Sequence, residues 1–143
     1  MQRQLIDVLV LGLLVALAAG SAQAQSPIAR AHVPFDFVVG DTRLPAGQYT
    51  IASAAPDVAP ELLLFRDAKG RVREVTMSTR MEPNSNSKEA KLIFHRYGAR
   101  HFLSQVWLTA GESGCDVRKG SQEKELAERG AGVQTAILLA SAR

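Results

Sequence analysis

The chain has 143 residues, a length that supports one domain with one hydrophobic core. Its formal net charge of +3 is small and dispersed. Nucleic acid is not an expected partner, because no aromatic side chains are interleaved in the densest basic patch, which consists of Arg66, Lys69, Arg71 and Arg73. The single cysteine, Cys115, excludes an intramolecular disulfide and lies in a segment that we expect to be an exposed loop.

Residues 1–24 have the features of a secretory signal peptide. Arg3 lies in a short polar start, an apolar run covers residues 8–19, and Ala22-Gln23-Ala24 provides small residues at positions −3 and −1 of a cleavage site. We therefore expect export to the periplasm or the cell exterior and a mature domain of residues 25–143. The apolar run is shorter than the roughly 20 residues of a membrane-spanning helix, so an uncleaved anchor is the less favoured alternative. No stable membrane span is expected after the signal is removed.

The first part of the mature chain contains two predicted strands. Residues 32–39 alternate apolar and polar side chains, which is typical of a half-buried strand. Pro34 cannot donate a ladder hydrogen bond, so it indicates a sheet edge or the beginning of regular pairing. The next predicted strand, 48–53, places Tyr49 and Ile51 on one face.

Two predicted hairpins follow. Residues 61–66 and 72–79 are joined by Asp67-Ala68-Lys69-Gly70, where the glycine suits a left-handed residue after a type I turn. The remaining predicted strands are a second hairpin around Gly98 and a terminal β-type run, at residues 91–97, 101–108 and 133–140.

One short helix is expected before the terminal run. Ser121 can cap its N-terminus, and Glu123 and Glu125 lie near its positive end. Glu125 and Arg129 are spaced for an ion pair, and Gly130 is expected to stop the helix.

These elements predict an all-β fold. About seven short strands with turns between them and one short C-terminal helix indicate a single-domain antiparallel β-sandwich or small barrel. No strand–helix alternation is present, which excludes a doubly wound parallel sheet.

Several short sequence blocks of this chain resemble blocks of known proteins. The chain resembles a group of small exported bacterial proteins of uncharacterised function, in which such blocks follow a signal peptide. The resemblance implies an exported β domain over nearly the whole mature chain, and it transfers no site residues. The blocks are Val33-Pro34-Phe35-Asp36-Phe37, Leu44-Pro45-Ala46-Gly47-Gln48-Tyr49, Phe94-His95-Arg96-Tyr97-Gly98, Phe102-Leu103-Ser104-Gln105-Val106-Trp107 and the Glu123-Lys124-Glu125-Leu126 core of the helix.

The hairpin around Gly98 provides the best candidate site. If its loop spans residues 98–100, Tyr97 pairs with His101, and a loop of another length would change both faces. With this pairing, one face is a core surface of Leu92, Phe94, Phe102, Val106 and Leu108. The other face also carries Ile93 and Leu103, and its aromatic and polar side chains are the predicted ligand-binding residues His95, Tyr97, His101, Gln105 and Trp107. Packing of this face beneath another layer is the alternative.

Catalytic and metal-binding patterns are weak. His95 and His101 could approach each other, but a tetrahedral metal site needs three or four ligands, and His32 and Asp36 lie on another predicted strand. Gly111-Glu112-Ser113-Gly114 is one residue short of a nucleophile elbow. We therefore predict no enzyme activity, no cofactor and no metal.

The predicted function is a non-catalytic binding or interaction module of the cell envelope. Its partner would be an envelope or extracellular protein, a glycan or a small ligand. The first alternative is a structural subunit that assembles through edge-strand pairing, with residues 133–140 as the candidate edge. The less favoured alternative is a hydrolase or metal site around His95 and His101.

Overall fold

The computed structural model describes residues 28–83, 89–108 and 114–142. The predicted signal peptide, 1–24, and residues 111–113 lie outside the described residues. Within the described ranges the chain is mostly β with one short helix, in agreement with the predicted all-β class. No helix in these ranges is long and apolar enough to cross a membrane.

The described strands number eleven, more than the predicted seven. One predicted strand is divided where Pro34 interrupts the pairing. The other three additional strands, at residues 42–44, 115–117 and 141–142, contain too few residues for a recognisable pattern. The helix α2 (Ser121–Glu128) precedes the last two strands. The strands are β1 (Ile28–Val33), β2 (Phe37–Val39), β3 (Thr42–Leu44), β4 (Gly47–Ala55), β5 (Ala59–Asp67), β6 (Val72–Arg80), β7 (Lys91–Tyr97), β8 (Arg100–Trp107), β9 (Cys115–Val117), β10 (Gln134–Leu139) and β11 (Ser141–Ala142).

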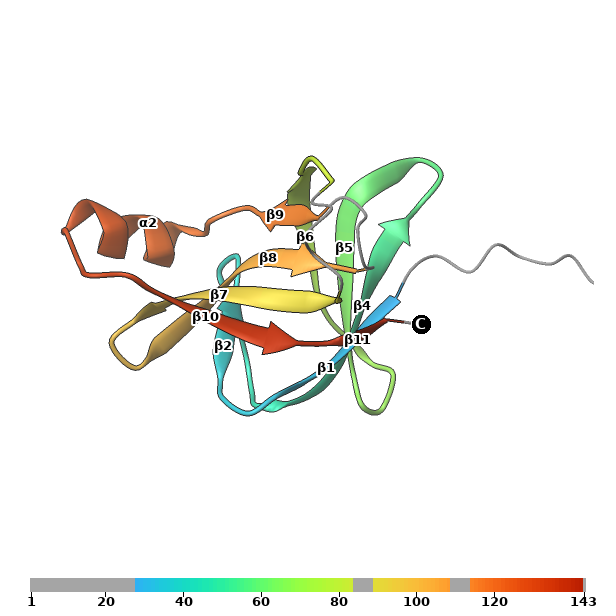
Figure 1. The fold of residues 1–143 in the computed structure, drawn as a ribbon, viewed down its shortest axis with the longest axis horizontal. Helices are drawn as coiled ribbons and strands as arrows, with labels where there is room; N and C mark the ends of the chain where they lie inside the picture. The colour runs from blue at the N-terminus through green and yellow to red at the C-terminus, as the bar shows by residue number, and fades with distance from the viewer. Residues whose placement is uncertain (1–27, 84–88, 109–113, 143) are drawn as a thin grey trace, which may run out of the picture.

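The strands form one sheet with the hydrogen-bonded order β10-β7-β8-β9-β6-β5-β4-β1-β11 (Figure 1). β2 lies off this path, where it pairs in parallel with β8 and antiparallel with β3. β10 and β11 stand at opposite ends of the order, yet only Ala140 separates them in the sequence. The C-terminal segment therefore pairs first with β7 and then with β1.

Period-two alternation places the core on one face of the sheet. In β1, Ala29, Ala31 and Val33 are buried, whereas Arg30 and His32 are exposed. Tyr49 and Ile51 are buried on the same side, which confirms the predicted face of β4. The main core cluster also contains Phe37, Val39, Leu44, Leu63, Phe65, Leu92, Phe94, Leu103, Val106, Leu108 and Val117.

The β5–β6 turn has the predicted geometry. Gly70 has a φ of 76°, in the left-handed region, and its N–H donates to the Asp67 carbonyl over 2.9 Å. Cys115, in contrast, is not in an exposed loop as predicted. It lies in β9 and is half-buried against the core cluster.

The helix α2 begins differently from the prediction. Gly120 is its N-cap residue and Ser121 its first helical residue. The capping acceptor comes from the β2–β3 turn, where Asp41 Oδ1 lies 2.7 Å from both the N and the Oγ of Ser121. The predicted end at Gly130 is confirmed, since this residue has a φ of 72°. A remote carboxylate therefore both caps the helix and fastens it to the sheet.

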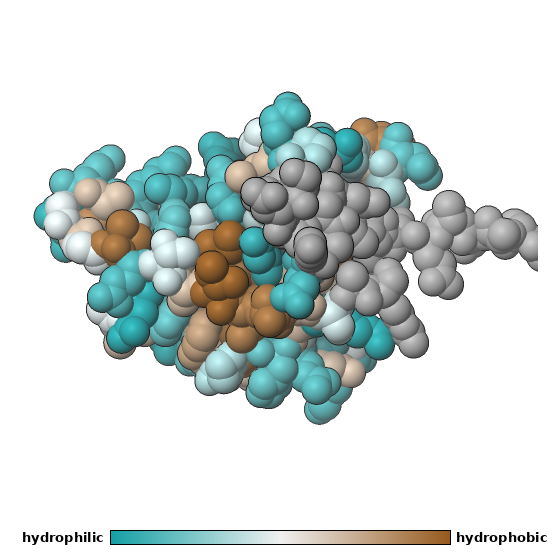
Figure 2. Space-filling model, viewed as in Figure 1, coloured by the Kyte–Doolittle hydropathy of each residue, from teal (hydrophilic) through white to brown (hydrophobic). Residues whose placement is uncertain are grey.

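Exposed apolar side chains gather on the outer face of β10. Ile137 and Leu139 are 61% and 64% exposed, and Ile93 of β7 lies opposite Ile137. Figure 2 shows apolar side chains collected over β10 and β7, with hydrophilic side chains around them. Large exposed apolar side chains that adjoin one another in this way often mark an interaction surface.

Candidate functional site

The β7–β8 hairpin turns more tightly than the prediction assumed. Tyr97 pairs with Arg100, so the loop is Gly98-Ala99 and the predicted pairing of Tyr97 with His101 is wrong. A bulge follows, because Ile93 pairs with Gln105 and Phe94 with Leu103. Ser104 is the extra, unpaired residue of the bulge. From Gln105 onwards the side chains of β8 therefore lie on the faces that the sequence predicted.

The tighter turn separates the predicted site residues. His95 lies opposite Phe102, whereas His101 lies opposite Arg96 and thus faces the other side of the sheet. Phe102 and Leu103 exchange their predicted faces for the same reason. His95, Tyr97, Gln105 and Trp107 remain on the outer face. His95 and His101 therefore cannot share a metal ion.

His101 packs as an aromatic side chain. Its ring stacks on Phe35 with a centroid distance of 3.8 Å and an interplanar angle of 16°. Its Nδ1 atom is buried and has no hydrogen-bond partner in the described part of the chain. Burial, together with the nearby charge of Arg96, lowers the pKa of His101 and favours the neutral ring.

The helix α2 covers the His95 and Tyr97 end of the outer face. Glu123 is 2% exposed, and its Oε1 lies 2.7 Å from His95 Nδ1 and accepts a 3.5 Å hydrogen bond from the Tyr97 hydroxyl. Burial raises the pKa of Tyr97, and the Glu123 carboxylate raises it further. Leu126 and Ala131 pack on a second small core of Val38, Tyr97 and Phe102. This end of the predicted face is thus occupied by the protein itself.

Trp107 is also buried, at 5% exposed. A Cβ atom on Gly114 would lie 2.7 Å from the indole ring, so the backbone of Gly114 packs directly against it. The indole N–H donates to Gln105 Oε1 over 3.3 Å, and the Lys91 ammonium lies 5.7 Å from the ring centroid. A ligand-binding role for these residues stays a prediction. A groove lies elsewhere in the described part of the chain.

We expect Glu123→Ala to lower the free energy of unfolding by about 1–3 kcal/mol, because it leaves His95 and Tyr97 without their buried acceptor. The matched control is Glu125→Ala on the same helix, where an exposed pair with Arg129 should contribute about 0.5 kcal/mol or less. Urea unfolding followed by circular dichroism measures both variants. Equal losses would contradict a structural role for the Glu123–His95 contact.

A groove of about 640 Å³ opens on the outer face of β1, β4 and β5. We call it the basic groove. It is bounded by the β5–β6 turn on one side and by Ser141 of β11 on the other. Its lining residues that carry polar side chains are Arg30, His32, Gln48, Tyr49, Thr50, Arg66, Asp67 and Ser141.

The floor of the basic groove is a row of side chains across four strands. Thr50 of β4 pairs with Arg66 on one side and with Arg30 on the other, and Arg30 pairs with Ser141. Neighbouring strands lie about 4.8 Å apart, so the Cα atoms of Arg30 and Arg66 are roughly 10 Å apart. His32 and Gln48 form the next row. Two guanidinium groups therefore flank one hydroxyl.

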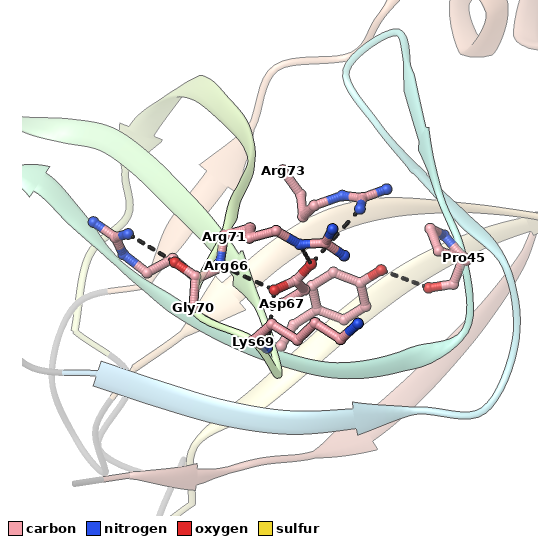
Figure 3. Close-up of polar contacts among 8 residues, drawn as sticks. Pro45, Arg66, Asp67, Lys69, Gly70, Arg71 and Arg73 are labelled. Atoms are coloured by element: carbon pink, nitrogen blue, oxygen red, sulfur yellow. Dashed lines mark hydrogen bonds and ion pairs between the residues drawn. The ribbon is translucent and has the colours of Figure 1, made fainter.

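Asp67, the one carboxylate among the described residues that line the groove, is already neutralised. Asp67 accepts hydrogen bonds from the backbone N–H groups of Lys69 and Arg71, and it forms ion pairs with Arg71 at 2.9 Å and Arg73 at 3.6 Å (Figure 3). Partial burial alone would raise its pKa, but the hydrogen bonds from Arg71 and Lys69 and the charge of Arg71 outweigh that effect, and the pKa lies below its ordinary value.

The two arginines of the groove floor keep their charge available. Arg66 donates to the Gly70 carbonyl over 3.0 Å, on the other side of the turn from Arg71 and Arg73 (Figure 3). In the described part of the chain, neither Arg66 nor Arg30 forms an ion pair with a carboxylate. The basic groove thus carries positive charge that no carboxylate of the described residues pairs with. In the sequence, Arg66 is recognisable only as part of the basic patch at a predicted turn, and no local pattern distinguishes Arg30.

Other chemistry is less well supported by the arrangement. In the described residues, no group of three or more His, Cys, Asp or Glu side chains is placed to hold a metal ion. No family model matches the chain, and no curated protein or solved structure is detectably similar to it. The resemblance to small exported bacterial proteins stays a prediction, and the function has to be inferred from the residues themselves.

Proposed function

We propose that this chain is an exported, non-catalytic binding module of the cell envelope, and that its basic groove receives a ligand carrying carboxylate, sulfate or phosphate groups. The observation that supports this function is the row in which Arg66 and Arg30 flank Thr50 without a carboxylate partner. The two guanidinium groups lie on β1 and β5, on either side of β4, and no carboxylate of the described residues pairs with them. Their like charges repel each other, and a bound anion relieves that repulsion.

The side chains of the groove suit oxyanion recognition. A guanidinium group presents a planar fork of N–H donors that matches two oxygens of one carboxylate, sulfate or phosphate group. The hydroxyl of Thr50 and the amide of Gln48 add neutral donors in the same groove. The Ser141 hydroxyl donates to the Arg30 carbonyl over 3.4 Å. The roughly 10 Å between the arginine backbones suits a ligand with two acidic groups, such as an acidic oligosaccharide.

The proposed architecture supports a rigid groove. We infer that the C-terminal segment closes the sheet into a small barrel, because its two parts pair with strands at the opposite ends of the order. Closure at this seam holds neighbouring strands in register. Ser141 stands at this seam, beside Arg30. The groove would then be formed before the ligand arrives, which reduces the entropic cost of binding.

The test is the affinity of the chain for inorganic phosphate, inorganic sulfate and trigalacturonate, measured by NMR titration. We expect shifts at Arg30, Thr50 and Arg66, and a loss of affinity of about tenfold or more in the Arg30→Gln, Arg66→Gln double variant, because each charged hydrogen bond contributes about 1.5–3 kcal/mol. The control is Arg43→Gln, Arg129→Gln, which removes the same charge from exposed ion pairs outside the groove. Equal weakening in both double variants would reduce the binding to nonspecific charge attraction. Absence of binding to all three probes would reject the oxyanion ligand.

A further inference from the structure

One edge of β10 has no partner among the described strands. β10 pairs with β7 on one side only, and it stands at the end of the strand order. The N–H of Ala140 donates to the carbonyl of Ala90 over 2.8 Å, so the backbone groups of every second residue before it also face β7. The backbone groups of Thr135 and Ile137 consequently point away from β7. Near its end the segment turns to β1, which leaves residues 133–137 as the free part of the edge.

This edge lacks the usual protection against pairing. Natural edge strands commonly carry a charged residue or a proline that discourages another strand from adding to them. Residues 131–142 contain no charged residue and no proline. The outward side chains of Val133 and Ile137 are 54% and 61% exposed.

We propose that the free edge of β10 binds the same edge of a second copy of this chain, so that two sheets join through antiparallel pairing of residues 133–137. A two-fold axis at Thr135 places the Thr135 side chains of the two copies opposite each other and places Val133 opposite Ile137 of the other copy. Threonine pairs and pairs of branched apolar side chains are favourable across antiparallel strands. The edge is thus complementary to itself, as a two-fold interface requires.

The absence of charged residues along this edge favours a second copy over an acidic or basic partner. The chain has a net charge of +3, so two copies repel each other over most orientations. The uncharged strip 131–142 is where that repulsion is smallest, and it has no charge with which to attract an oppositely charged surface. Ile93, which pairs with Ile137, would extend the shared apolar surface beside the joined strands. The basic groove lies on β1, β4 and β5, so pairing at this edge leaves it open.

The first experiment measures the mass of the purified protein by sedimentation equilibrium over a wide concentration range. We expect a monomer–dimer equilibrium that Ile137→Lys weakens by about tenfold or more, since two ammonium groups would be brought into an apolar contact. The control is Val58→Lys, which places the same charge on an exposed valine of the β4–β5 turn and should leave the dimer unchanged. A monomer at all concentrations overturns the proposal. Equal effects of both lysines also overturn it.

The second experiment tests the register. Thr135→Cys in a Cys115→Ser background should form a disulfide-linked dimer rapidly, because residues directly opposite in an antiparallel pair have Cα atoms about 4.5–5.5 Å apart, within disulfide range. Thr79→Cys in the same background is the control, as Thr79 is an exposed strand residue paired with β9. Crosslinking at equal rates would reject the Thr135 register. Failure of ligand binding in the groove leaves both outcomes unaffected.

Discussion

Phe94→Ala should lower the free energy of unfolding by about 3–5 kcal/mol, the largest loss expected for a single substitution in this chain. Phe94 is fully buried, and its ring meets Phe35 and Phe37 edge to face at centroid distances of 5.2 and 5.7 Å. Alanine removes the ring that both neighbours contact and leaves a cavity between them. Since small domains are stable by only about 5–15 kcal/mol, the variant should unfold at a clearly lower urea concentration.

Val58→Ala provides the matching control. This valine is 88% exposed, so removing its methyl groups should change the free energy of unfolding by about 0.5 kcal/mol or less. Both variants are measured by urea unfolding with circular dichroism at a single pH. A loss below about 1 kcal/mol for Phe94→Ala would contradict the assignment of this face of β7 to the core.

Local sequence patterns were sufficient for most strands. Alternation identified the buried faces of β4 and β7, because side chains alternate strictly along an extended chain. Gly70 marked the β5–β6 turn, because only glycine adopts a left-handed conformation without strain. These signals depend on neighbouring residues alone. They can therefore be recognised in the sequence without knowledge of the tertiary structure.

The candidate site was predicted less well, because it depends on register. Loops of two, three or four residues around Gly98 were all compatible with the sequence, and the two-residue loop that forms sends His101 to the core side. No glycine or proline lies next to Ser104 in the sequence, so no local signal predicts the bulge. The displacement by one residue moves the side chains between the turn and the bulge, residues 101–103, to the opposite face. A face composed from sequence alone therefore mixed residues from both sides of the sheet.

Contacts between distant segments were beyond sequence reasoning. The row of Arg30, Thr50 and Arg66 joins three strands, and no spacing in the chain reveals it. The cap on α2 joins Asp41 to Ser121, 80 residues apart. Glu123 was seen only as a favourable charge in the first helical turn, yet its burial follows from this remote attachment. Gly120 lies at the point where the start of α2 contacts the β2–β3 turn most closely.

Gly120→Ala should lower the free energy of unfolding by about 2–4 kcal/mol and loosen α2, from the steric cost of overpacking and the loss of a helix cap. Gly120 has a φ of −75°, which any residue adopts, so the effect is steric. A Cβ atom would overlap the carbonyl oxygen of Gly40 and would lie 2.6 Å from Asp41 Oδ1. Because the backbone of Gly40 occupies the space that the new methyl group needs, the start of the helix must move away from the β2–β3 turn. Ser121 then loses its hydrogen bonds to Asp41.

The same variant should also change the response to acid. The hydrogen bond from the Ser121 hydroxyl holds the pKa of Asp41 below its ordinary value of 3.8, so this carboxylate stabilises the fold above that pH and loses its contribution as the pH falls through the folded pKa. Gly120→Ala should remove that part of the acid dependence. Hydrogen exchange of the α2 amides and urea unfolding between pH 2 and 7 measure the two effects. The control is Gly132→Ala, whose Cβ would meet no atom within 4 Å. Equal protection of α2 in both variants would show that contact with Gly40 does not hold the helix in place.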